Sequence, residues 1–157
     1  WGELDYLIAD LPPGTGDIQL TIAQQVPITA AVVITTPQDL ALIDARKGIS
    51  MFEKVNIPVL GVIENMSYHV CSKCGHKEMI FGEGGGIKMA QQQGVQLLGQ
   101  VPLHIHIREQ SDDGVPIVVA EPHSKLAVNY QKIARKIAAS LYFSGKTEPS
   151  TIFAVNR

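Results

Sequence analysis

The sequence predicts an α/β domain with a mostly parallel sheet and helices on both faces. Short apolar, branched runs alternate along the chain with segments whose apolar residues recur every three or four positions. The runs are continuous rather than alternating between apolar and polar, as expected of strands buried on both faces. They occupy residues 6–9, 30–34, 59–63 and 97–101.

Helices are expected between these strands and after the last one. Three of them are predicted over residues 17–25, 39–53 and 86–93. Asp17 and Asp39 are the expected caps of the first two, and Gly94 ends the third. The second helix places four apolar residues on one face: Leu42, Ala45, Ile49 and Phe52. The last helix carries a stripe typical of core packing: Leu126, Tyr130, Ile133, Ala134, Ile137, Ala138 and Leu141.

Length and charge limit the classes of protein to consider. The 157 residues, with a mass of 17.0 kDa, suit a single domain over 1–157. Lys and Arg number 13 and Asp and Glu 15, so the net charge of −2 argues against a nucleic-acid partner. No apolar run reaches the roughly 18 residues that a membrane span needs. The abrupt start at Trp1 predicts the C-terminal part of a longer protein, and a loosely held tail is expected over 145–157.

The first run of functional interest follows the first predicted strand. Asp10 ends that strand and is followed by Leu11, Pro12, Pro13 and Gly14. A carboxylate at the end of a buried strand is costly unless it serves a partner, such as Mg²⁺ or its bound water. The stiff turn then brings a glycine N–H within reach of a phosphate, which is the form of a Walker B strand and its switch loop. The alternative is an aspartate that only caps a turn.

Cys71 and Cys74 form the second motif, and His69 and His76 flank them. Two thiolates at this spacing can hold one metal, but a closed tetrahedral site needs four ligands. The two histidines could complete a zinc site, or a second copy of the chain could add its own two thiolates around an iron–sulfur cluster. A redox dithiol and a structural pair of free thiols are the other interpretations. Such a thiol pair predicts a reducing compartment, by default the cytosol.

Three further features carry weaker signals. Asn65 follows the third strand and could read an adenine edge or simply form a turn. The glycines at 82 and 84–86 resemble a phosphate cradle, yet a hinge below the cysteine loop explains them at least as well. No dinucleotide fingerprint runs through Gly14 and Gly16, because position 19 is Gln19. His104 and His106 are expected on the surface or in a lid.

Taken together, these motifs resemble the Mrp/ApbC family of MinD-like P-loop ATPases that act as iron–sulfur cluster carriers. The resemblance rests on the run 5–17, on Thr35-Thr36-Pro37, on 61–66 and on the cysteine pair, in this order. It covers residues 5–142, and it implies a P-loop NTPase-like fold of the MinD type that is incomplete at its N-terminal side.

The resemblance also implies roles for individual residues. Asp10 would lie near the Mg²⁺ of ATP, and the turn from Pro12 through Pro13 to Gly14 would form the switch at the γ-phosphate. Asn65 would contact adenine, with Pro102 lining the same pocket. In a homodimer, Cys71 and Cys74 would join their counterparts around a bridging [4Fe-4S] cluster. The family couples nucleotide binding to delivery of that cluster to apo-proteins.

One departure from the family limits these expectations. The family's deviant Walker A loop lies upstream of the Walker B strand, and no lysine of this sequence follows a strand in such a glycine loop. We therefore expect this chain by itself neither to bind ATP well nor to hydrolyse it, although the parent protein would be an ATPase. The loss of the strand that precedes this loop should leave a gap in the sheet or force a rearranged or swapped packing. A zinc-stabilised partitioning ATPase domain and a dithiol redox protein are the alternative functions.

Overall fold

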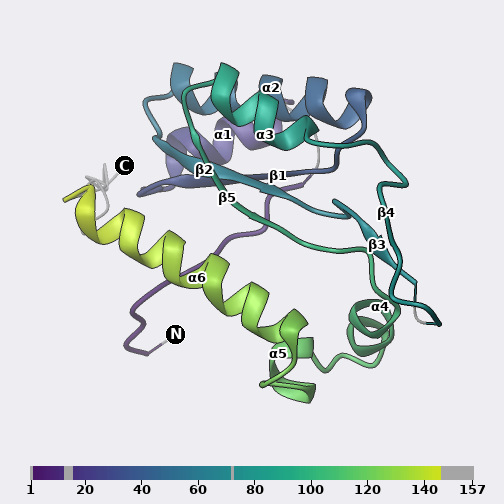
Figure 1. The fold of residues 1–157 in the computed structure, drawn as a ribbon. Coiled ribbons are helices and arrows are strands. Elements are labelled where there is room, and N and C mark those ends of the chain that lie inside the picture. Colours follow the sequence, from purple (N-terminus) through teal and green to yellow (C-terminus); the bar gives the residue numbers. More distant parts are fainter. Residues whose placement is uncertain (1, 13–15, 72, 146–157) are drawn as a thin grey trace, which may run out of the picture.

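Three parallel strands form the sheet at the centre of the molecule. The computed structural model describes residues 2–12, 16–71 and 73–145. The strands are β1 (Ala31–Thr35), β2 (Val59–Glu64) and β5 (Gln96–Gln100), in the spatial order β1-β2-β5 (Figure 1). Each lies within two residues of its predicted position, because its apolar run is buried between helices. The central strand is the most enclosed, and Val62 within it is fully buried.

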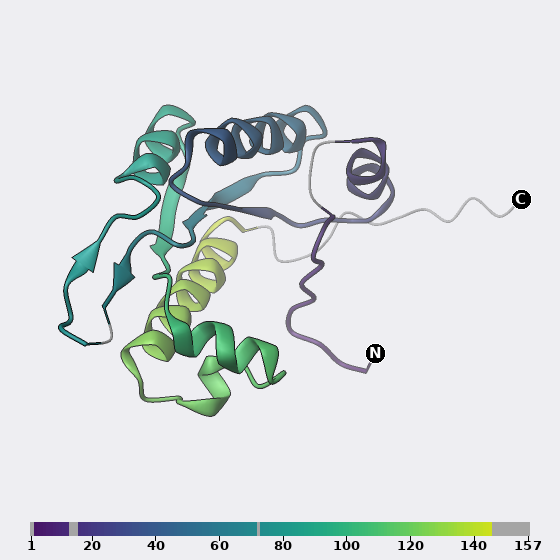
Figure 2. The same ribbon diagram turned by 90° about the vertical axis from the view of Figure 1, so that its right-hand side faces the viewer.

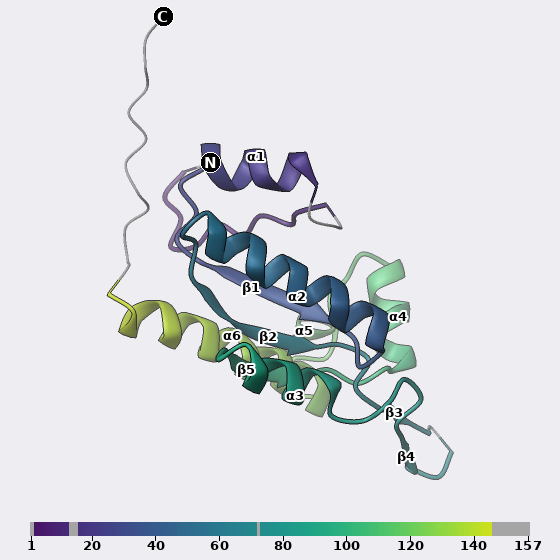
Figure 3. The same ribbon diagram turned by 90° about the horizontal axis from the view of Figure 1, so that it is seen from above.

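Helices cover both faces of the sheet, as predicted. On one face lie α2 (Asp39–Lys54) and α3 (Gly85–Gln92), and on the other lies α6 (Lys125–Phe143) (Figure 1). The helix α1 (Asp17–Gln25) joins the first face beside α2 (Figure 3). The predicted apolar face of α2 is confirmed, because all four of its residues are buried in the core on that side.

The core is divided by the sheet into two clusters. The larger one lies under α1, α2 and α3 and includes Ile49 and Met89, both fully buried. The smaller one joins Leu98 and Val101 to Ile133 of α6. The stripe predicted for α6 contributes Ile133 as its buried residue and Tyr130 and Ile137 as partly buried neighbours, while Ala134 is exposed.

The predicted helix caps are shifted by one residue. Gly16 and Gln38 are the N-cap residues of α1 and α2, and neither makes a side-chain capping bond. Asp17 and Asp39 are instead the first helical residues. Their carboxylates still lie at the positive end of the helix dipole, so an acidic residue is favourable there.

The strand predicted over residues 6–9 does not form. These residues have no regular structure, and Tyr6, Leu7 and Ile8 are exposed by 60%, 66% and 91%. A strand needs a neighbouring backbone to bond its N–H and C=O groups. The resemblance places another strand between this segment and β1. Among the described residues, β1 pairs with β2 alone and forms one edge of the sheet.

Several short elements were not predicted. A hairpin of β3 (His69–Val70) and β4 (Lys77–Glu78) projects from the carboxyl end of the sheet (Figure 2). After β5 come α4 (Ile105–Asp112) and α5 (Ile117–Ala120). The predicted tail lies outside the described residues from position 146 onward. Within the described part of the chain, no helix is both long enough and apolar enough to cross a membrane.

Candidate functional site

The candidate site lies at the carboxyl ends of the three parallel strands. Thr35 of β1 pairs with Glu64 of β2, which in turn pairs with Gln100 of β5. The three strands therefore end side by side, and the residues that follow them are brought to one edge. Ligands of open parallel sheets bind at this edge.

Asn65 and Pro102, the two residues predicted to line a base pocket, flank adjacent strand ends. The backbone N–H of Asn65 donates to the carbonyl of Thr35 at 2.7 Å, and the N–H of Ser67 donates to the carbonyl of Val101 at 3.0 Å. Asn65 Oδ1 accepts from the N–H of Met66 at 2.9 Å, which supports the positive φ of 54° at Met66. The amide side chain therefore shapes its own turn, and among the described residues no hydrogen bond engages its Nδ2 donor.

Glu64 is the residue of this edge that sequence reasoning missed. Its side chain is fully buried and accepts three hydrogen bonds. The donors are Ser67 Oγ at 2.8 Å, Gln100 Nε2 at 2.7 Å and the backbone N–H of Gly86 at 2.5 Å. The signal was available, because a carboxylate directly after a buried apolar run is costly unless it is bonded.

The cysteine pair occupies the turn between β3 and β4. The N–H of Cys71 donates to the carbonyl of His76 at 2.9 Å, and the N–H of Gly75 donates to the carbonyl of Cys71 at 2.8 Å. Gly75 has a φ of +72°, which a glycine adopts without strain. Cys71 is half-buried and Cys74 is exposed, and both are free thiols. Both thiols therefore belong to one turn of the projecting hairpin, and the Cys74 thiol is the more exposed of the two.

The surroundings of Cys71 favour its thiolate form. Backbone hydrogen bonds from Cys74 and Lys73, together with the Cys74 side chain, lower the pKa of the Cys71 thiol below its usual 9.0. Burial and the negative charge of Glu78 raise this pKa in opposition. A thiolate is the form that binds metals and the form that attacks disulfides, so this shift is expected for a cluster ligand and for a redox thiol. The motif opens no helix, unlike the dithiol of thioredoxin-like proteins.

The two flanking histidines do not complete a metal site with the cysteines. His69 Nδ1 lies 3.3 Å from the carbonyl oxygen of Leu103, which ties the ring to the segment after β5. His76 is exposed, and its carbonyl closes the turn. Among the described residues, no group of three or more His, Cys, Asp or Glu side chains is placed to hold a metal ion. As potential metal ligands at this turn, the described part of one chain therefore provides only the two thiols.

Two of the predicted magnesium and switch residues, Asp10 and Pro12, lie in the described part of the chain. Asp10 and Pro12 are exposed, and the segment that carries them pairs with no strand. Gln19 Nε2 donates to the carbonyl of Pro12 at 2.9 Å, so the segment is held against α1 instead. Pro13 and Gly14 lie outside the described residues.

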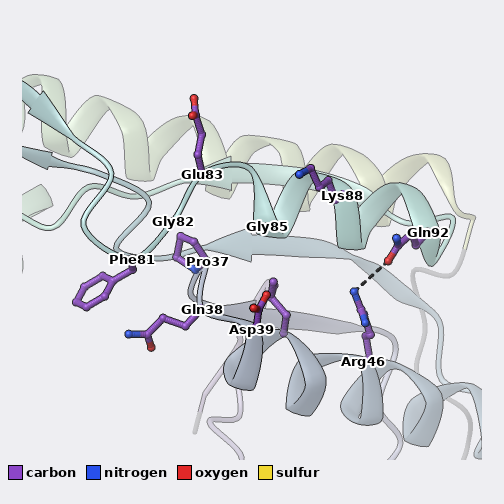
Figure 4. A pocket seen from close by; sticks show the side chains of 11 residues that line it. Pro37, Gln38, Asp39, Arg46, Phe81, Gly82, Glu83, Gly85, Lys88 and Gln92 are labelled. Carbon is purple, nitrogen blue, oxygen red and sulfur yellow. Dashed lines mark hydrogen bonds between the residues drawn. The ribbon is translucent and has the colours of Figure 1, made fainter.

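The glycine cluster forms one wall of an open pocket of about 300 Å³ between α2 and α3 (Figure 4). A Cβ atom at Gly85 would lie 2.7 Å from the carbonyl oxygen of Pro37 and 2.8 Å from Leu42 Cδ1. Close packing of α3 against the start of α2 therefore requires this glycine. Arg46 and Lys88 line the pocket together with Asp39 and Glu83, so its charge is mixed. This geometry favours a packing role over a phosphate cradle.

His104 and His106 lie at the start of α4, where a hydrogen bond joins them. His104 Nδ1 accepts from the N–H of His106 at 3.2 Å as the cap of the helix, and His106 Nδ1 lies 3.3 Å from Glu121 Oε1. Burial lowers the pKa of His104, and the neighbouring His106 lowers it further. The predicted surface position is confirmed for His106, which is exposed.

The fold and this edge define a class of protein: a parallel α/β domain with a hairpin that carries a pair of free thiols. The chain belongs to the family of NUBPL iron-transfer P-loop NTPases within the ParA group, whose model matches residues 1–138. This match confirms the resemblance on which the sequence-based interpretation rests.

Similar proteins carry names that agree with this family. The iron-sulfur cluster carrier protein of Escherichia coli strain K12 is 59% identical over 152 residues, which are 97% of this chain and 41% of that protein. The iron-sulfur cluster transfer protein NUBPL of Mus musculus is 53% identical over 141 residues, 90% of this chain and 44% of that protein. The chain thus spans less than half the length of these relatives.

Solved structures confirm the predicted MinD-type fold. A nucleotide-binding protein of Archaeoglobus fulgidus, solved in complex with ADP, is 38% identical with a TM-score of 0.68, covering 80% of this chain and 51% of that one. The cell division ATPase MinD of Pyrococcus furiosus is 24% identical with a TM-score of 0.55, covering 71% of this chain and 43% of that one. The second likeness concerns the fold alone.

Proposed function

We propose that the protein containing this chain is an ATP-dependent carrier that binds a [4Fe-4S] cluster and transfers it to apo-proteins. The observation that carries the proposal is the turn of the projecting hairpin, which contains both Cys71 and the exposed Cys74 as free thiols. The names of the carrier and transfer proteins that resemble it support the same function. The cytoplasm is the proposed location, because labile clusters and free thiols persist in reducing compartments.

The cluster is proposed to bridge two copies of the chain. A [4Fe-4S] cluster takes four thiolates, and the described residues of one chain provide two. A two-fold axis through the cluster would bring Cys71 and Cys74 together with the same residues of a second copy. The exposed position of Cys74 at the end of a projecting hairpin leaves room for that copy.

The nucleotide is proposed to bind at the carboxyl edge of the sheet. Asn65 would read the adenine edge through its amide, and Pro102, buried beside it, would line the base pocket. Asp10 would act on Mg²⁺ through water, and Pro12, Pro13 and Gly14 would form the switch, once a phosphate-binding strand and loop lie beside β1. A strand in that place would also give residues 6–9 the neighbouring backbone that a strand requires.

Anaerobic reconstitution of the intact protein with iron and sulfide tests this function. We expect a cluster band at about 400 nm, four irons per two chains, a dimer by mass in solution and transfer of the cluster to an apo acceptor. Stoichiometric zinc without that band would favour the zinc-stabilised partitioning ATPase. A reversible Cys71–Cys74 disulfide with no cluster would favour the dithiol redox protein.

The 157 residues on their own are expected not to bind Mg-ATP. Among the described residues, no strand of the parallel sheet is followed directly by a glycine loop that carries a lysine, so the phosphates would lack most N–H donors and the main positive charge. Isothermal titration of this chain with Mg-ATP should show no heat of binding in the micromolar range. Micromolar affinity would contradict this prediction and locate the phosphate site within these residues.

A further inference from the structure

We propose that Glu64 is a positioning residue that couples the nucleotide-base pocket to the cysteine hairpin, which we define as residues 68–84. The inference rests on the proposed function, since it assigns a route between the two sites proposed there. The proposal rests on one buried carboxylate. It accepts hydrogen bonds from residues on both sides of the hairpin and from the strand end near Pro102.

Both ends of the cysteine hairpin are held by this one side chain. Ser67, directly before the hairpin, donates its hydroxyl to Glu64 Oε1 at 2.8 Å. Gly86, two residues after the hairpin, donates its backbone N–H to Glu64 Oε2. This N–H belongs to the first turn of α3, where backbone donors have no partner within the helix. The position of the hairpin relative to the sheet therefore follows the position of the Glu64 carboxylate.

The same carboxylate is bonded to the base-pocket side. Gln100, the last residue of β5 and two residues before Pro102, donates Nε2 to Glu64 Oε1 at 2.7 Å. Asn65 follows Glu64 directly, and the N–H of Val101 donates to the Glu64 carbonyl at 2.8 Å. A ligand that moved Asn65 or Pro102 would therefore displace the carboxylate that holds the hairpin.

The packing around Glu64 leaves it little freedom to move by itself. A Cβ atom at position 86 would lie 2.7 Å from Glu64 Oε2 and 3.0 Å from Glu64 Cβ, so glycine is required for this approach. None of the ion pairs found among the described residues involves Glu64. A buried carboxylate without a cation depends on its hydrogen-bond donors, and losing one is costly. The strand end and the hairpin are thus expected to move together.

The test compares cluster release with and without Mg-ATP in the intact protein. Release to an iron chelator is followed for the parent, for Gln100→Leu and for the matched control Gln91→Ala, an exposed glutamine of α3. In the parent and the control, nucleotide should change the release rate by about fivefold or more, the lower end of ordinary coupling between sites. In Gln100→Leu, which leaves both hairpin contacts in place, the effect should fall to within about twofold.

Two further variants separate coupling from a merely structural role. In Glu64→Gln, the amide oxygen can accept from Gly86 while the NH₂ group donates to Ser67 and to a reoriented Gln100, so the coupling should persist. In Glu64→Ala it should be lost. Iron content and nucleotide affinity of Gln100→Leu should equal those of the parent, because a general loss of structure would lower both.

Hydrogen exchange of residues 68–84, with and without nucleotide, gives a readout that needs no cluster. If the parent bound no cluster, the proposed function would fail, and this readout would still test the coupling. Nucleotide-dependent protection of the hairpin in the parent, absent in Gln100→Leu and Glu64→Ala, is expected. Equal nucleotide effects in the parent and in these two variants, or none in the parent, would overturn the inference.

Discussion

Replacing Cys74 with alanine is expected to abolish the cluster absorbance at about 400 nm in the reconstituted protein. The change removes two of the four thiolates at once, because a bridging site uses each cysteine in both copies. Iron content per chain should fall to the background level, and the cluster-dependent dimer should dissociate. Absorbance, iron analysis and mass in solution measure these effects. Cys71→Ala should give the same result.

His76→Ala is the matched control for this prediction. His76 has an exposed side chain in the same turn, and its contact with Cys71 uses the backbone carbonyl, which alanine keeps. The variant should therefore retain the full cluster band. Loss of the band in His76→Ala, together with its survival in either cysteine variant, would point to a histidine-containing centre instead.

Gly61→Val should lower the free energy of unfolding by about 3 kcal/mol. Gly61 lies in the central strand, where a Cβ atom would collide with the carbonyl oxygen of Gln96 and lie 2.8 Å from Leu98 Cγ. Valine is favoured in strands by propensity, so any large loss must come from this collision. Chemical denaturation of the intact protein, followed by circular dichroism, measures the change.

Gly48→Ala is the opposite case and serves as the control. Gly48 lies in the interior of α2, and a Cβ atom there would meet no atom within 4 Å. Alanine should raise the free energy of unfolding by about 0.5–1 kcal/mol, since glycine loses more backbone entropy in a helix. A Gly61→Val variant as stable as the parent would show that β2 and β5 can separate without cost.

Much of the fold could be predicted from local pattern. Continuous apolar runs located β1, β2 and β5, and the spacing of Leu42, Ala45, Ile49 and Phe52 identified the buried face of α2. These features depend on residues close in sequence and on burial between layers, which the pattern itself expresses. The run at 6–9 has the same pattern, yet it forms no strand, because pairing depends on which backbone lies beside it.

In the candidate site, too, some residues could be predicted from local spacing, and others are brought together only by the fold. Cys71 and Cys74 could be identified by their spacing, since both sulfurs come from one turn. Glu64 could not be recognised as the centre of a network, because Gly86 and Gln100 are 22 and 36 residues away in sequence. The bonds that hold a buried carboxylate are formed by whichever donors the packing brings to it.

The sequence by itself determined the α/β class, the strand-end location of the site and the thiol pair, because these follow from composition and short-range spacing. Only the tertiary structure decided that residues 6–9 remain unpaired, that the thiols of one chain stand without further ligands among the described residues, and that Glu64 joins the hairpin to the sheet. Each of these depends on contacts between distant segments, whose energies are set by burial and by the donors available in space.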